Sequence, residues 1–192
     1  MATWSSTKGG AHAPLAEGTS AYSVEPASNP PLANLNQDQL KNAGMASKLL
    51  MASFGEIVSV LLRSHEYRDR PLSALEEIAI PAALTGQFSL AQAQSAVNGM
   101  VASVGVVFWA RVSPEVDKRL VENISAPLKL STREWRSGTI IWIVDAVGEQ
   151  KVIEAMLSRL LETQWTGQEV RLRARTNEGT YKLGVLGRDP AK

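Results

Sequence analysis

The first apolar pattern along the chain has the spacing of a helix. Apolar side chains recur every three or four residues between residues 45 and 61, which places them on one helical face. These positions are Met45, Leu49, Ala52 or Phe54, Ile57, Val58 and Leu61. Pro71 follows, and a proline disfavours helical backbone at the residue before it, so the helix is expected to end before this point.

A second, shorter helix is expected after Pro71. Ser73 and Glu76 have the spacing of a capping box, in which the two side chains satisfy the first free N–H groups of a helix. The helix then runs to about Leu84, with Pro81 as a break within it or near its end. Gly86 is typical of a helix end.

The apolar period changes to two after Gly86, which predicts strands. Residues 88–94 alternate apolar and polar side chains, Asn98-Gly99 is a hairpin turn signal, and residues 101–110 form an apolar run. The two strands are therefore expected to pair as a hairpin.

The second half of the chain alternates further helices and strands. Ser113 before Pro114 predicts the N-cap of a short helix. The continuous apolar run over residues 140–144 is typical of a central strand that is buried on both faces. The remaining pattern predicts a helix over residues 149–163, a strand over 169–175, a turn at Gly179 and a last strand over 181–186.

This order of elements predicts a single α/β domain with a mixed, largely antiparallel central sheet flanked by helices. The same order occurs in N-acetyltransferase-like folds, which bind acyl thioesters at a central strand, although order alone is a weak argument for function. Residues 1–38 are expected to form a disordered tail, because they hold four of the nine prolines and are rich in Ala, Ser, Gly and Asn. The domain then covers residues 39–192.

Composition narrows the possible chemistry. The formal net charge of +1 gives no indication of a nucleic-acid partner, and the chain has no Cys, which excludes disulfides, thiolate nucleophiles and Cys-based metal sites. The apolar stretches fall short of the roughly 20 residues that a membrane span needs. The N-terminus lacks the pattern of a secretory signal, so a cytoplasmic protein is expected.

Several segments together resemble one protein family. The most specific is Trp135-Arg136-Ser137-Gly138, followed by Trp142-Ile143-Val144-Asp145. Supporting similarities lie at residues 54–58, Ser64, Arg68, residues 71–73, Pro81, residues 86–88, residues 108–110, Ser113 and Glu115. Over roughly residues 52–186, the chain is similar to the bacterial RTX toxin-activating lysine acyltransferases, the toxin-activating C proteins.

The resemblance implies an enzyme that moves a fatty acyl group from acyl carrier protein to the side-chain amine of internal lysines in an RTX toxin-like protein. The co-substrate would be the phosphopantetheine thioester of the carrier, with no bound cofactor and no metal. A homodimer is also implied. The absence of Cys rules out an acyl-Cys intermediate and favours direct transfer in a ternary complex.

The family pattern also assigns the catalytic residues. Asp145 matches the family Asp at the end of the central strand. When the chain is aligned on Ser64, Arg68 and Pro71, the family's catalytic His position holds Tyr67, and His65 lies two residues earlier. Either His65 serves as the base, or Tyr67 takes a different role, or the ordinary activity is lost. The family's Pro-Phe-Gly after the Asp is also missing.

The reaction explains why these residue types are candidates. A lysine ammonium has a pKa near ~10.4 and must lose a proton before it attacks a thioester, and a His is a suitable base near neutral pH. Asp145 would orient the imidazole or receive the ammonium. Ser64 or free strand N–H groups would stabilise the oxyanion, with Tyr67 as a further supporting or packing residue.

Carrier binding calls for basic side chains, because acyl carrier proteins are acidic. Arg171, Arg173 and Arg175 share one side of a predicted strand by their period of two, and Arg68 flanks the candidate catalytic loop. The alternative for the three strand arginines is a solvated sheet face. Two other functions also remain open: an acyltransferase that uses acyl-CoA or a small amine, and a relative that binds an acyl chain or carrier without turnover.

Overall fold

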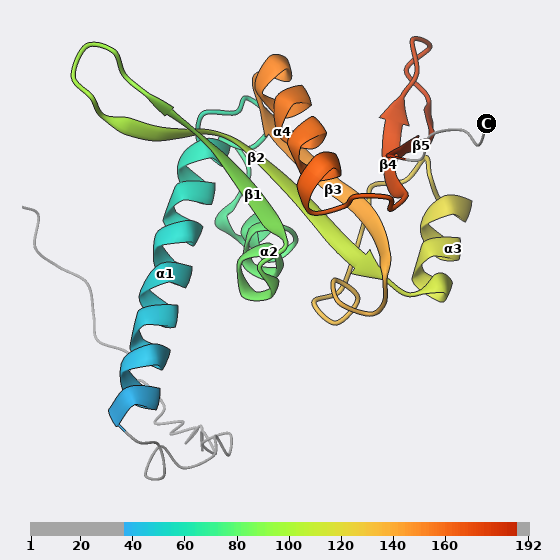
Figure 1. Cartoon of the computed structure of the whole chain (residues 1–192). Helices are drawn as coiled ribbons and strands as arrows, with labels where there is room; N and C mark the ends of the chain where they lie inside the picture. The colour runs from blue at the N-terminus through green and yellow to red at the C-terminus, as the bar shows by residue number, and fades with distance from the viewer. Residues whose placement is uncertain (1–36, 188–192) are drawn as a thin grey trace, which may run out of the picture.

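One five-stranded sheet organises the protein, in the order β1-β2-β3-β4-β5 (Figure 1). The computed structural model describes residues 37–187. The strands are β1 (Phe88–Gln94), β2 (Val101–Val112), β3 (Ile140–Gly148), β4 (Val170–Arg175) and β5 (Tyr181–Leu186). All neighbours pair antiparallel except β3 and β4, which are parallel. The predicted α/β fold with a mixed, largely antiparallel sheet is confirmed.

Helices cover both faces of this sheet. They are α1 (Gln37–Leu61), the 3-10 helix η2 (Leu72–Glu76), α2 (Ala79–Thr85), α3 (Pro114–Glu122) and α4 (Gln150–Thr163). The end of α1 and helix α2 pack on one face, and α4 packs on the other (Figure 1). The predicted tail, residues 1–38, lies outside the described residues, apart from Gln37 and Asp38, which belong to α1.

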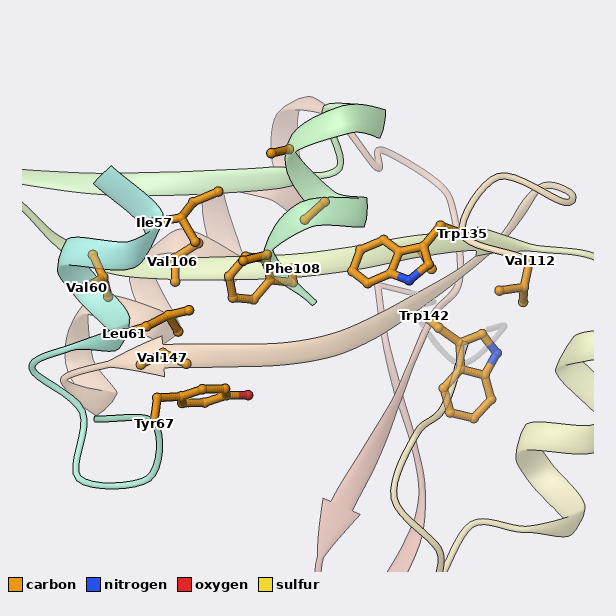
Figure 2. Packing of buried hydrophobic residues seen from close by; sticks show 14 of the residues in the cluster. Ile57, Val60, Leu61, Tyr67, Val106, Phe108, Val112, Trp135, Trp142 and Val147 are labelled. Atoms are coloured by element: carbon orange, nitrogen blue, oxygen red, sulfur yellow. The ribbon is translucent and has the colours of Figure 1, made fainter. Parts of the chain in front are cut away.

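Alternation along β2 and β3 produces two cores, one on each face of the sheet. Val106 and Phe108 point to the cluster under α1 and α2, whereas Val107 and Trp109 point to the cluster under α4. The period of two that predicted the strands is therefore also what divides their side chains between the cores. Figure 2 shows the first cluster, in which Phe108 lies between the α1 side chains and Trp135.

The start of the second helix differs from the capping-box prediction, which is wrong. Pro71 precedes a 3-10 helix and no side chain caps it, and the α-helix begins only at Ala79. Pro81 therefore lies in the first turn of α2, where a missing N–H costs no hydrogen bond. Gly86 ends α2 with φ 67°, as predicted.

Helix α1 is longer and more apolar than the sequence pattern indicated. It begins at Gln37, eight residues before the first position of the pattern, with Asp38 favourably placed in its first turn. Its stretch Lys41–Leu61, 21 residues with mean hydropathy 1.3, is long and apolar enough to cross a membrane by length and composition alone. Core helices of soluble proteins pass the same test but are mostly buried, whereas 17% of the apolar window of α1 is buried. The end of α1 packs into the core, with Ile57 and Leu61 buried.

The Trp-Arg-Ser-Gly segment clamps the end of β2. The N–H of Arg111 donates to the Trp135 carbonyl at 2.9 Å, and the N–H of Gly138 donates to the Arg111 carbonyl at 3.0 Å. Ser137 Oγ accepts the N–H of Ser113 at 2.9 Å. A Cβ on Gly138 would lie 2.6 Å from Ser113 Cα, so only glycine fits this close approach.

Strands β3 and β4 are paired only near their start. Their register joins Ile141 to Val170 and Trp142 to Arg171 and goes no further. Beyond Trp142, β3 is hydrogen-bonded to β2 alone. Asp145 lies in this freed part of β3, on the strand at the middle of the sheet.

Candidate active site

A β-bulge sets the direction of the Asp145 side chain. Phe108 on β2 is opposite Asp145, but the next residue, Trp109, is opposite Ile143, so Val144 has no partner across the strand pair. Val144 packs against the core under α1 and α2, and regular alternation would turn Asp145 toward α4. The extra residue instead brings Asp145 to the α1 side, where it meets Tyr67.

Tyr67 and Asp145 form the polar contact at the centre of the site. The Tyr67 side chain is 8% exposed, and its hydroxyl donates a hydrogen bond to Asp145 Oδ2. The other carboxylate oxygen, Oδ1, accepts the N–H of Ala146 at 2.7 Å. Figure 2 shows Tyr67 among the buried side chains close to Val147 of β3. Each carboxylate oxygen of Asp145 therefore accepts one hydrogen bond from the protein, and these two hydrogen bonds fix the orientation of the carboxylate.

The loop after α1 carries Tyr67 to this position. The Ser64 carbonyl accepts the N–H groups of Tyr67 at 3.2 Å and Arg68 at 3.0 Å, and Ser64 Oγ accepts the N–H of Glu66 at 3.3 Å. The guanidinium of Arg70 lies 4.4 Å from the centre of the Tyr67 ring. Ser64 therefore shapes the loop through local hydrogen bonds.

His65, the other candidate, lies on the surface of the same loop. Its side chain is exposed, and within residues 37–187 it makes no hydrogen bond or ion pair. The structure thus brings Tyr67 and Asp145 together and leaves His65 outside that contact. His65 and Tyr67 are two residues apart in the loop, and the loop turns the Tyr67 side chain toward the core and the His65 side chain toward solvent.

The environment of Tyr67 keeps its phenol neutral. Burial raises the pKa of Tyr67 well above its ordinary value, and the negative charge and hydrogen bond of Asp145 raise it further. At neutral pH the hydroxyl is therefore a hydrogen-bond donor to Asp145, and it cannot act as a general base.

Alkaline pH is expected to reveal this contact. Because folding raises the Tyr67 pKa above its ordinary value of 10.0, the folded state holds the phenolic proton at a pH where the unfolded chain releases it. The free energy of unfolding should fall above pH 10, by at most about 1.4 kcal/mol per pH unit from this group. Urea unfolding at pH 8 to 11 measures the slope. Tyr67→Phe should remove that contribution, and an unchanged slope in this variant would contradict the assignment.

The predicted carrier-binding arginines differ in how many contacts their guanidinium groups already make within the protein. The guanidinium of Arg171 is held by the carboxylates of Asp117 and Glu169, at 2.5 Å and 3.0 Å. Arg173 stacks on the Tyr181 ring at 3.5 Å. Arg175 is exposed and has no ion pair within the described residues, and Arg68 pairs with its exposed neighbour Asp69. Arg68 and Arg175 are thus the two whose charge remains most available to a partner.

A pocket of about 340 Å³ lies between the end of α1 and the end of β3. Ser64 and Arg63 line it from the loop, and Val147 and Gly148 line it from the end of β3. Ser64 is three residues before Tyr67, and Val147 is two residues after Asp145, so the pocket lies near the pair, although neither Tyr67 nor Asp145 lines it. No cluster of three metal-ligating side chains occurs in residues 37–187.

A polar cluster between α1 and the β1–β2 hairpin was missed in the sequence. Glu56 accepts the Ser103 hydroxyl at 2.6 Å and the Gln92 amide at 3.1 Å, and these hydrogen bonds, first that of Ser103, lower the pKa of Glu56. The guanidinium of Arg63 donates to the Ser103 carbonyl. These contacts tie α1 to the β1–β2 hairpin. No sequence signal connects residues 36 to 47 positions apart in this way.

One protein family matches most of the chain. No curated protein matches the chain. The model of one family, described as the RTX toxin acyltransferase family, matches residues 47–186. That match starts within α1, ends with β5 and includes the Tyr67–Asp145 pair and the pocket. The chain therefore belongs to the RTX toxin acyltransferase family, whose members are acyltransferases that activate RTX toxins.

Proposed function

We propose that this acyltransferase moves a fatty acyl group from acyl carrier protein to lysine side chains of an RTX toxin, in the cytoplasm. The observation that carries the proposal is the Asp145 carboxylate, which the bulge directs toward α1 and which Tyr67 and Ala146 hold by hydrogen bonds. A pocket lined by Val147 lies two residues further along the strand. A fixed carboxylate near a surface pocket is suited to receive a lysine ammonium and orient its nitrogen.

The proposed reaction is a direct transfer. The lysine ammonium gives one proton to Asp145, and the free amine attacks the thioester carbonyl carbon. The C–N bond forms, the C–S bond breaks, and the second proton of the attacking nitrogen passes to the leaving sulfur. Asp145 then returns its proton to solvent. Tyr67 acts by positioning, because its neutral hydroxyl fixes one oxygen of Asp145.

Carrier recognition is proposed for the exposed basic side chains. Arg68 follows the loop that holds Tyr67, and Arg175 ends β4. Arg171 would have to break its ion pair with Asp117 before it could bind an acidic partner, and neither Arg68 nor Arg175 makes that ion pair. A second copy of the chain is proposed as a further partner, in line with the homodimer that the family resemblance implies.

Mass spectrometry of an RTX toxin substrate after incubation with acylated carrier protein tests the function. Wild type should add the acyl mass to lysine. The His65→Ala variant should keep at least a third of the wild-type rate, because this side chain is exposed and outside the contact with Asp145. A matched reaction with acyl-CoA as donor distinguishes the carrier from a free thioester. Loss of transfer in His65→Ala would return the base role to His65.

A binding-only relative is the second candidate, and one observation favours it. The Asp145 oxygens already accept hydrogen bonds from the Tyr67 hydroxyl and the Ala146 N–H, and within residues 37–187 no imidazole donates to them. In that case the protein would bind acylated carrier protein but add no acyl mass to any lysine.

A further inference from the structure

A second hollow of about 740 Å³ lies between α4 and the edge strand β1, on the sheet face opposite the Tyr67–Asp145 pair. It is a groove that follows the helix, because its lining includes residues from Lys151 at one end of α4 to Thr163 at the other. Its deep wall is apolar and includes the buried side chains of Met156 and Leu160. The groove is larger than the pocket beside the pair.

Small side chains explain why helix and strand leave this space unfilled. Ala91 and Ala93 line it from β1, and Ala155 lines it from the facing side of α4. A methyl group on each side is too short to bridge the distance between a helix and a sheet edge, whereas larger apolar residues would fill it. A groove lined mainly by apolar groups with a few polar ones is typical of sites for apolar ligands.

The charges on the groove all have one sign. Among the residues that the structure describes, Lys151 and Arg159 are its charged lining residues and no carboxylate lines it. Within residues 37–187 neither cation makes an ion pair. They are eight residues apart on α4, which corresponds to about 12 Å along the groove. An unpaired positive rim over an apolar wall suits a molecule that combines an anionic part with a hydrocarbon chain.

The groove also adjoins the site. Val104 of β2 lines both this groove and the pocket beside Tyr67 and Asp145. Both hollows therefore border on Val104, and the pocket is also lined by Gly148 and Glu149, where β3 ends and α4 begins. A chain that starts in the pocket would have to cross β2 at Val104 to continue under α4.

We propose that the α4–β1 groove binds the hydrocarbon tail of the fatty-acyl donor, with the thioester end in the pocket beside Asp145. The assignment of this ligand as the acyl donor rests on the proposed function. The length of the groove then limits the chain length that the enzyme transfers, and the Lys151–Arg159 rim attracts the anionic donor.

Titration with free fatty acids of 8 to 16 carbons tests the groove without carrier or toxin. Affinity should rise about threefold to fourfold for each added methylene until the groove is full. Ala155→Trp should weaken hexadecanoate binding at least tenfold, because the indole fills the groove. Ser158→Trp is the matched control, since Ser158 is exposed on α4 but does not line the groove, and its binding should equal wild type.

Reversal of the rim charges in the double variant Lys151→Glu/Arg159→Glu provides a second test that leaves the groove open. It should weaken binding at low salt and have little effect at high salt. The proposal would be overturned if neither Ala155→Trp nor the reversal of the rim charges changed the affinity for the fatty acid. It would also be overturned if wild type showed no saturable binding. In the transfer assay, Ala155→Trp should shift the preferred donor toward shorter chains. Acylation by Ala155→Trp with an unchanged chain preference would contradict the groove proposal and leave the proposed function intact. Fatty-acid binding in the groove without acylation of any lysine would support the groove and contradict the proposed function.

Discussion

Replacing Asp145 by Asn is expected to lower kcat/KM for acyl transfer by roughly 10²-fold to 10⁴-fold, the usual contribution of a positioned proton-transfer group. The amide has nearly the same shape as the carboxylate, so its oxygen can still accept the Ala146 N–H. The Tyr67 hydroxyl can turn and accept from the new amide group. What the variant loses is the negative charge and the ability to take a proton from the lysine ammonium.

The stability of this variant separates chemistry from folding. Its midpoint of urea unfolding should stay close to that of wild type, while the rate of lysine acylation collapses. Tyr67→Phe is the matched positioning variant, and it should lose less activity because Asp145 keeps its charge and its contact with Ala146. An Asp145→Asn enzyme that retains transfer within threefold of wild type would remove the carboxylate from the mechanism.

The strands could be predicted well because their patterns are local. β1 and β5 have the predicted bounds, and the loop between β1 and β2, residues 95–100, includes Asn98 and Gly99, where Gly99 has a positive φ of 70°. The helical start at Ser73 was wrong because a capping box only offers hydrogen bonds to a helix. Here the backbone after Pro71 forms a 3-10 turn, and the α-helix starts at Ala79, where it can bury apolar side chains.

The site was only half predictable for a physical reason. The importance of Asp145 followed from the family resemblance, but its direction depends on the bulge at Val144, and no residue type there signals one. Whether His65 or Tyr67 faces inward is likewise decided by a few backbone dihedrals in the loop. An apolar ring with a polar tip can enter the core, so burial favours Tyr67.

The most distinctive sequence segment serves the fold more directly than the chemistry. Trp135 is fully buried, and Gly138 permits a backbone approach that any Cβ would block. The resulting clamp holds the end of β2 to the chain that enters β3, and β3 carries Asp145. The segment is therefore linked to the site through the position of a strand, with no side chain that needs to touch a substrate.

Trp142→Ala is expected to cost about 3–5 kcal/mol of the free energy of unfolding, the range for loss of a large buried aromatic side chain. The ring is fully buried between β3 and the helices, and its Nε1–H donates to Asp117 Oδ1 at 2.8 Å. The same carboxylate holds Arg171. Trp142 therefore joins the core to an ion pair that bridges α3 and β4, and its removal loosens both.

Two tryptophan-to-phenylalanine variants separate packing from the hydrogen bond. Trp135 and Trp142 are both fully buried, but Trp135 Nε1 has no hydrogen-bond partner among the described residues. Both variants remove a similar ring volume, whereas only Trp142→Phe breaks a hydrogen bond to a charged group, worth about 1.5–3 kcal/mol. Urea unfolding should show Trp142→Phe to be the more destabilised by about that amount. Equal losses would mean that the indole–Asp117 bond adds nothing to the stability of the fold.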